Sequence, residues 1–550
     1  MLGHSERRVA LWLAVLLALS GLTLGWRYYE RQTWLMPQAG GEYSEGVVGN
    51  PRTANPLLAT TDADLDLAYL THRGLFRTDE QGNLVTDLAQ NWSLSDDRKT
   101  YLITLQTGLR WSDGQPLTAT DVVFTFQSTT QPGLASPLAA SFRDVAVVAA
   151  EDGLTASFTL KEPYVPFLSA LTVGLIPQHV WQNVPLDRWS EAEANLKPIG
   201  SGPWQFSSLT HDGQGNVRSY VLETNPNWIG QMPYFKQFTL RFYPDTTSAL
   251  EALRQSTIEG LGELTRRDKA SLNPRRFVVY DVTLPQYTAV FYNQNASPVL
   301  KNTLIRQGLS YAINRPALIQ AALSGQAQPA TGPFTFGEVK DRTAPQAITY
   351  DPTKTVQLFE QAGFSRSGQN VPFNKDGIPL EITLTTVDYE EQLRVAEEVK
   401  RQWEAVGVVV SLELVAASDL QANTITPRNY QALLMSEVVG LDPDPYPFWH
   451  SSQATAPGLN LAQFKNHEAD QLLVGARQNA DPNSRLDAYV RFQNILQEES
   501  PATFLYSSSY SYAQSYATKG FSRTVLGQPA ERLWDAGNWY ERTSRNRSPE

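Results

Sequence analysis

Residues 438–473 read VVGLDPDPYPFWHSSQATAPGLNLAQFKNHEADQLL, a stretch that combines acids between prolines, aromatic residues and the start of a helix. Asp442 and Asp444 each precede a proline, which disfavours helical backbone in the residue before it and predicts a rigid, extended or turned segment. An aromatic cluster follows between Tyr446 and Trp449. Rigid acids beside aromatic rings suit the wall of a polar-ligand site better than they suit a catalytic pair.

The pattern of residues before this stretch predicts a βαβ unit. A strand is predicted at 381–386, and a helix at about 389–406, where apolar residues recur every three or four positions. Gly407 ends that helix, and the apolar run from Val408 predicts the next strand. The second half of the chain is therefore predicted to be α/β.

The first half has a different pattern. Residues 74–127 are rich in turn signals such as Asp113-Gly114, and apolar residues alternate along residues 101–105, which predicts half-buried strands. Thr120 is the predicted N-cap of a helix that follows these strands. A β-rich unit is expected here.

Length and composition set limits on the function. A chain of 550 residues is too long for one compact core, so two or three domains are expected. The net charge of -11 argues against a nucleic-acid partner, which would need a basic surface. The sequence contains no cysteine, which excludes disulfides, cysteine-ligated metals, a thiol nucleophile and a lipid-modified cysteine.

The N-terminal segment predicts attachment to a membrane. Arg7 and Arg8 precede an uncharged apolar run of 18 residues from Val9 to Trp26, which is about the minimum for a membrane-spanning helix. An uncleaved signal-anchor is favoured, and a cleaved signal peptide is the alternative. Residues 1–34 are therefore predicted to be a cytoplasmic stub with a transmembrane helix, and residues 35–49 a Gly- and Pro-containing linker.

Motifs of common enzyme classes are absent from the sequence. There is no phosphate loop, no G-x-G-x-x-G and no G-x-S-x-G nucleophile turn. His467-Glu468 begins a zinc-protease pattern, but Gln471 stands where the second histidine is needed. No enzyme activity, cofactor or metal is predicted.

Two acidic patterns in the sequence resemble functional sites. The alternating aspartates of residues 62–66 resemble a calcium loop, but Leu67 occupies its glycine position, so a solvated helix N-terminus is favoured. The pair Asp442 and Asp444 could serve a glycosidase, although its spacing between prolines favours a structural turn.

Seven stretches together resemble the solute-binding proteins of ABC importers, extracytoplasmic family 5, which includes dipeptide-, oligopeptide- and nickel-binding members. They occur in the family's order between about residues 46 and 520: LAQNWSLSDDRKTYLITLQTGLRWSDGQPLTATDVVFTFQS, PIGSGPWQF, NPNWIGQMPYFKQFTLRFYPD, LIRQGLSYAINRPALI, YDPTKTVQLFEQAGF, DPDPYPFWHSS and FKNHEADQLLVGARQNADPNSRLDAYVRFQNILQEESPATFLY.

The resemblance implies an α/β, two-lobed periplasmic-binding-protein fold (Venus-flytrap, class II or cluster C) with an extra β-rich subdomain. It implies the following division: lobe I at 50–77, 199–285 and 504–550, the subdomain of lobe I at 78–198, and lobe II at 286–503. The lobes are expected to close on a ligand by hinge motion.

The resemblance also implies where ligand binds, between the first strand of lobe I and lobe II segments near the DPDP sequence. The candidate ligand-binding residues are Asn50, Arg52, Tyr292, Asn293, Glu437, Asp442, Trp449 and Tyr506. Trp449 and Tyr292 could equally belong to the core, and Asn50 could satisfy a turn. Leu441 stands where peptide binders often hold the ligand's amino terminus with an aspartate; Glu437 or Asp442 could substitute.

The implied function is that of a monomeric receptor, anchored in the cell membrane with its globular part outside the cytoplasm. It would capture a peptide or other small solute and deliver it to ABC transporter permease subunits. The alternatives are an oligosaccharide or nickel-chelate receptor of the same fold, a sensor that signals through the N-terminal helix, and a hydrolase using Asp442 or Glu437.

Overall fold

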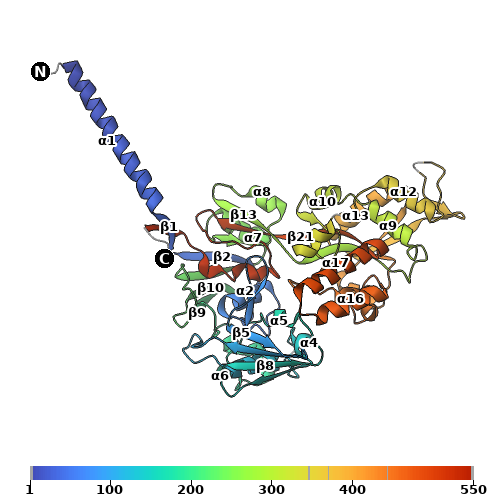
Figure 1. Cartoon of the computed structure of the whole chain (residues 1–550), viewed down its shortest axis with the longest axis horizontal. Helices are drawn as coiled ribbons and strands as arrows, with labels where there is room; N and C mark the ends of the chain where they lie inside the picture. The colour runs from blue at the N-terminus through green and yellow to red at the C-terminus, as the bar shows by residue number, and fades with distance from the viewer. Residues whose placement is uncertain (1–3, 135, 345–346, 369–370, 443, 547–550) are drawn as a thin grey trace.

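The computed structural model describes residues 4–134, 136–344, 347–368, 371–442 and 444–546. Two lobes lie side by side, and helix α1 (His4–Gln32) projects away from them (Figure 1). A smaller unit that contains β5 and β8 lies below the first lobe in this view and faces the second lobe.

A sheet of twelve strands runs through both lobes. Its longest strand, β21 (Ala502–Ser515), pairs with β14 (Gln286–Tyr292) along its first part and with β13 (Phe277–Thr283) along its last part. Besides β13, the first lobe contributes β2 (Glu42–Val48), β9 (Trp204–His211), β10 (Val217–Thr224), β11 (Gln237–Tyr243) and β12 (Gly260–Leu261). Those of the second lobe, beyond β14, are β15 (Ala327–Pro329), β18 (Glu381–Val387), β19 (Val409–Val415) and β20 (Ala432–Val438).

The predicted βαβ unit is confirmed. Strands β18 and β19 pair in parallel, and α13 (Glu390–Ala405) connects them. Trp403 of α13 is fully buried, and its indole N–H donates to the Leu309 carbonyl at 3.0 Å. The repeat of apolar residues every three or four positions was sufficient to place this helix to within about one residue.

Helices cover both faces of the second lobe's sheet, as expected when strands are buried on both sides. One face packs against α9 (Thr303–Tyr311), α10 (Arg315–Leu323), α12 (Pro352–Gln361) and α13. The other packs against α16 (His467–Gln478) and α17 (Pro482–Glu499). Asp351 caps α12 as predicted, because its carboxylate accepts from the Lys354 backbone N–H at 2.9 Å.

The β-rich unit has a core of its own. Its four-stranded antiparallel sheet contains β5 (Ala89–Leu94), β6 (Thr100–Leu105), β8 (Thr155–Leu160) and β7 (Val145–Ala149), in that order. Helix α3 (Ala119–Ser128) packs on this sheet. Its N-cap is Thr118, not Thr120 as predicted, because the Thr118 N–H donates to the Asp121 carboxylate at 2.9 Å.

The predicted linker at 35–49 is wrong. Most of it is strand: β1 (Trp34–Gln38) pairs with β22 (Arg542–Asn546), and β2 lies inside the first lobe's sheet between β11 and β12. The glycines and proline of this segment suggested a flexible chain. Gly46 lies within β2, and a larger residue would not fit there because the Ile258 side chain occupies the space that a Cβ would need.

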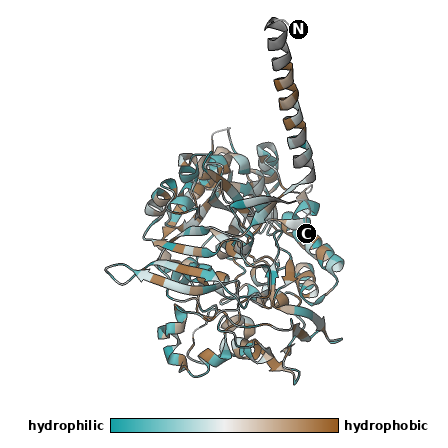
Figure 2. Cartoon of the chain, turned by 90° about the vertical axis from the view of Figure 1, so that its left-hand side faces the viewer, coloured by the Kyte–Doolittle hydropathy of each residue, from teal (hydrophilic) through white to brown (hydrophobic). Residues whose placement is uncertain are grey.

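Helix α1 stands apart from the body, with apolar residues along its middle (Figure 2). Large apolar side chains such as Leu17 and Leu22 are 77% and 70% exposed. Within the described part of the chain, no helix combines the length and the apolar character that crossing a membrane requires. The predicted transmembrane helix is therefore not supported by the described residues.

Candidate ligand-binding site

The two lobes are joined through a narrow hinge region of the large sheet. Only Leu284 and Pro285 separate β13 from β14, and β21 changes its partner from β14 to β13 between Tyr506 and Ser509. The β14–β21 ladder has a register shift at Thr288, next to this change. Few residues therefore need to change their backbone angles for one lobe to rotate against the other.

Ligands of open parallel sheets bind beyond the carboxyl ends of the strands. In the second lobe, β20 ends at Val438, which is 61% exposed. Leu441, in the following loop, packs against two glycines of the first lobe. A Cβ added at Gly82 would lie 3.3 Å from a methyl carbon of Leu441, and one added at Gly527 would lie 3.0 Å from the other. The loop after β20 thus borders the region between the lobes.

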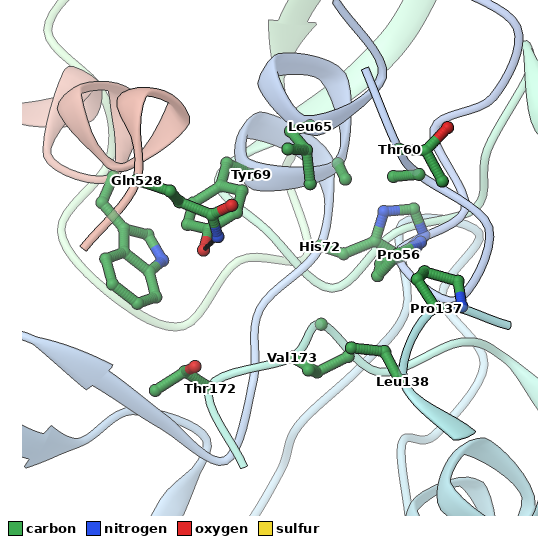
Figure 3. Close-up of a pocket in the computed structure, with 14 residues that line it drawn as sticks. Pro56, Thr60, Leu65, Tyr69, His72, Pro137, Leu138, Thr172, Val173 and Gln528 are labelled. Atoms are coloured by element: carbon green, nitrogen blue, oxygen red, sulfur yellow. Dashed lines mark hydrogen bonds between the residues drawn. The ribbon is translucent and has the colours of Figure 1, made fainter. Parts of the chain in front are cut away.

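A cavity of about 340 Å³ lies next to this contact, in the first lobe (Figure 3). Its walls come from the Pro56–Thr60 segment, α2 (Asp62–Thr71) with His72, the loop at Pro137 and Leu138, the loop at 172–174, and Gln528 with Trp534. Gln528 directly follows Gly527, against which Leu441 packs. The volume is within the range of small-ligand pockets.

The described residues that line the cavity carry no formal charge. Burial lowers the pKa of His72 to about 3, so its imidazole is neutral at physiological pH. The Gln528 amide donates to the Tyr69 hydroxyl, and the Tyr69 ring meets the Trp534 ring edge-on at 5.0 Å. An apolar or uncharged polar group fits these walls best, because a charged group would lose its hydration without a counter-charge.

Two acids, Asp62 and Glu263, lie outside the cavity, in a separate recess near the start of α2. Asp62 precedes Leu65 by three residues on α2, so both side chains are on neighbouring positions of one helix face. The recess lies at the carboxyl ends of β2 and β12. Desolvation first, and then the negative charge of Asp62, raises the pKa of Glu263. A cation between these carboxylates would relieve the part of their repulsion that Arg532, which lines the same recess, does not already offset.

An ion-pair network supports the same end of the first lobe. The Arg532 guanidinium donates to Glu45 at 3.0 Å and to Asp66 at 2.6 Å, and all three side chains are buried. Burial raises the pKa of Glu45 and of Asp66, and the opposing charge of Arg532 limits the rise. The network holds α2 against the C-terminal segment.

This network corrects the prediction of a solvated N-terminus at residues 62–66. Asp64 and Asp66 are 2% and 1% exposed, because each has a tertiary partner. The Asp64 carboxylate accepts from the backbone N–H groups of Arg52 and Thr53 at 2.7 and 3.1 Å. No group of three or more metal-ligating side chains occurs among the described residues.

The lobe I candidates lie close to this region, but neither lines the cavity. The Asn50 side chain donates to the Val217 carbonyl at 2.9 Å, which ties the end of β2 to β10. Arg52 contributes its backbone N–H to Asp64, and its side chain is exposed.

Glu437 and Trp449 meet in the core of the second lobe. The Tyr287 hydroxyl donates to Glu437 and accepts from the Trp449 indole N–H at 3.2 Å. Trp449 and Tyr287 are fully buried, and Glu437 is 5% exposed. Desolvation raises the pKa of Glu437 to about 8. These groups are organised around one another and not around a space for ligand.

The other four candidates also have internal partners or are buried. Tyr292 and the Thr503 hydroxyl are 2.6 Å apart, and the Asn293 amide donates to the Arg428 carbonyl at 2.9 Å. Asp442 pairs with Arg485. Tyr506 lies in β21 at the hinge and is 1% exposed.

The cavity residues were not found from the sequence. Helical periodicity places Leu65 and Tyr69 on one face of α2, but the opposing walls come from segments far away in the chain. Neutral, unremarkable residue types leave no motif, so only the three-dimensional arrangement shows the cavity.

Comparisons with known proteins identify the family. Residues 83–458 match the model of the bacterial extracellular solute-binding proteins, family 5 (middle region). The chain belongs to this family. The two-lobed periplasmic-binding-protein fold predicted from the sequence is therefore confirmed.

Similar proteins extend over nearly the whole chain. The oligopeptide-binding protein AppA of Bacillus subtilis is 28% identical over 92% of both sequences. Its structure in complex with a nonapeptide superposes with a TM-score of 0.66 and 25% identity, covering 92% of this chain and 100% of that one. NikZ of Campylobacter jejuni, in complex with Ni(L-His), has a TM-score of 0.69 and 24% identity, covers 91% and 99%, and shows the fold alone.

Proposed function

We propose that this protein is an extracytoplasmic receptor that captures a peptide between its lobes and presents it to the permease of an ABC importer. The observation that carries the proposal is the neutral, largely apolar cavity beside the loop that follows β20. The similarity to an oligopeptide-binding protein over 92% of the chain supports the peptide assignment.

Closure is proposed to move residues 286–503 against the rest of the body. The chain passes between these parts at the β13–β14 connection and along β21, which is the arrangement of a two-strand hinge. The cavity lies in the part formed by residues 50–77, 78–198, 199–285 and 504–546, and the loop at Leu441 would close over it.

The chemistry of the cavity favours a peptide over the other ligand classes. Its aromatic and aliphatic walls suit an apolar peptide side chain. A nickel chelate would gain little from walls without a charge. A sensor that works without a permease would bind the same peptide, so the identity of the partner protein distinguishes a sensor from a transport receptor.

The peptide's amino terminus is assigned in this proposal to Asp62 and Glu263. The acids favoured by the family pattern have other partners: Glu437 is buried against Tyr287, and Asp442 pairs with Arg485. Asp62 and Glu263 are exposed, repel each other and line a recess at the start of α2, the helix that also forms one wall of the cavity. An ammonium group between them would be favourable.

The protein is proposed to be a binder and not a hydrolase. The acids of the DPDP sequence are each paired with an arginine, Asp442 with Arg485 and Asp444 with Arg477. Neither is therefore available as a general base. Glu437 is buried in the lobe core, away from the lined cavity.

Attachment to a membrane through α1 is also proposed. The described side chains of α1 are exposed and mostly apolar, and the uncharged run of the sequence extends from Val9 to Trp26. Trp26 and Trp34 flank the end of this helix, as interfacial aromatic residues do. Alkaline carbonate extraction tests this: an anchored chain stays with the membranes, and a peripheral one is released.

Native mass spectrometry of the gently purified full chain tests the function. A bound mass that is released on denaturation and fragments as a peptide supports the proposal. A released sugar or metal chelate would contradict it. Incubation of the protein with the released peptide separates a binder from a hydrolase, because a binder returns the peptide intact.

A further inference from the structure

The β-rich unit at residues 78–198 contacts the second lobe at one end of a helix. Helix α16 ends at Gln478, and the last carbonyl groups of any helix lack partners within it. Here the Val165 N–H donates to the Arg477 carbonyl at 2.8 Å, and the Arg98 guanidinium donates to the Gln478 carbonyl at 3.0 Å. The unit thus caps a helix that belongs to the other lobe, and Arg98 places a cation at its negative end.

Side chains continue the same contact. The Arg477 guanidinium lies between two rings, 4.9 Å from the centre of Tyr164 and 4.1 Å from the centre of Tyr446. His450 stacks on the far side of Tyr446 at 4.2 Å. Asp444 accepts from Arg477 at 2.8 Å and from the Tyr164 hydroxyl at 3.3 Å. Of these groups, only Tyr164 comes from the β-rich unit.

This contact lies away from the hinge. The hinge is at the centre of the large sheet, where β21 changes partner, whereas α5 (Phe167–Ala170) and α4 (Ala139–Phe142) face α16 lower in Figure 1. A rotation that separates the lobes would therefore break the contact, leaving the Arg477 and Gln478 carbonyls to water and Tyr164 without its cation.

We infer that Arg98, Tyr164 and Val165 form a clasp that closes on the end of α16 and stabilises the form in which the lobes are together. This inference deepens the proposed function: the three clasp residues set ligand affinity although none of them lines the cavity. A ligand that binds the closed form gains affinity in proportion to the population of that form. The clasp residues are positioning residues.

The distance between the lobes tests the clasp without any ligand. The chain contains no cysteine, so Val148→Cys in the β-rich unit and Leu459→Cys in the second lobe accept spin labels selectively. Both positions are exposed, at 60% and 45%. Distance distributions from electron double resonance then report the fractions of closed and open protein in the labelled full chain.

The variant Arg98→Ala/Tyr164→Ala removes three side-chain contacts: the Arg98 bond to the Gln478 carbonyl, and the contacts of Tyr164 with Arg477 and Asp444. The expected result is a shift toward longer distances, with the closed-to-open ratio falling by about thirtyfold to several hundredfold, the range expected for losing one exposed cation–π contact and one charge-assisted hydrogen bond. Arg98→Ala alone changes an exposed side chain, and it replaces the double variant in this test if the double variant does not fold. Lys99→Ala is the matched control, since Lys99 pairs with Glu162 inside the unit.

An unchanged distance distribution in the folded Arg98→Ala/Tyr164→Ala variant, or in Arg98→Ala if only that one folds, overturns the clasp. So does an equal shift in Lys99→Ala, which would indicate general loosening of the unit. The result does not depend on a peptide ligand. If neither wild type nor variant binds peptide, the proposed function fails, while the distance measurement still decides the clasp.

Discussion

Glu437 provides a prediction about pH whose magnitude follows from the structure. Its carboxyl group is 5% exposed and accepts one hydrogen bond, from Tyr287, and its other oxygen has no partner among the described residues. Desolvation raises the pKa from an ordinary value near 4.5 to about 8. The folded protein therefore keeps a proton on Glu437 that the unfolded chain releases over this range.

The free energy of unfolding should consequently fall as pH rises from about 4.5 to about 8. Each pKa unit between the folded and unfolded states corresponds to about 1.4 kcal/mol. The loss is about 1 kcal/mol at pH 5, about 3 kcal/mol at pH 7 and about 5 kcal/mol at pH 9. Below pH 4.5 the group is protonated in both states and contributes no pH dependence.

The variant Glu437→Gln removes the ionisation and keeps an oxygen that can accept from Tyr287. Its buried amide group costs about 1 kcal/mol at every pH, because it has no clear acceptor. The difference in unfolding free energy between variant and wild type should therefore change by about 4 kcal/mol in favour of the variant between pH 5 and pH 9.

Urea unfolding followed by tryptophan fluorescence measures this difference at each pH. The exposed position of Glu468, on α16, supplies the control variant Glu468→Gln. A difference between Glu437→Gln and wild type that stays constant from pH 5 to pH 9 would refute the reasoning, since it would mean that Glu437 ionises as readily in the fold as in the unfolded chain.

Three further predictions concern the first lobe, one helix cap and the ligand. Arg532→Ala should lower the unfolding free energy by about 3–5 kcal/mol, because it leaves the buried carboxylates of Glu45 and Asp66 without a counter-charge. Urea unfolding measures this loss, and a change below about 1 kcal/mol would contradict the prediction. Asp351→Ala should lower the unfolding free energy by about 1 kcal/mol because α12 loses its N-cap, and urea unfolding measures this loss as well. Asp351→Asn should retain most of the capping stabilisation. Asp62→Asn should weaken a peptide with a free amino terminus more than its acetylated form in calorimetric titrations, and equal weakening of both would argue against an amine site there.

Local patterns predicted the parts of the fold that depend on local physics. The apolar repeat of α13 and the Asp351-Pro352 cap of α12 involve residues close in sequence, and both are confirmed. The linker at 35–49 was wrong because the pairing that makes it a strand comes from β11 and β12, about 200 residues later. Composition cannot indicate such a partner.

Less of the candidate site could be predicted from the sequence. The resemblance pointed to Glu437 and Trp449 by their place near the DPDP sequence, and the structure shows both in a buried cluster with Tyr287. The cavity depends on the meeting of α2 with the loop at 172–174 and with Gln528. These side chains are neutral and occur in any core, so their shared role depends on tertiary contacts alone.

The measurement closest to the central claim asks whether peptides occupy the cavity. Leu65 lines the cavity and is not part of the first lobe's hydrophobic core among the described residues, so Leu65→Trp should fill the space without disturbing the fold. Val148→Trp, at an exposed strand position, is the control.

Wild type, Leu65→Trp and the control would each be mixed with a tryptic digest of casein and analysed by native mass spectrometry. We expect the wild type and the control to retain the same peptides and Leu65→Trp to lose them. Retention of the same peptides by Leu65→Trp would contradict the assignment of the cavity, and a wild type that retains none would contradict the peptide receptor itself.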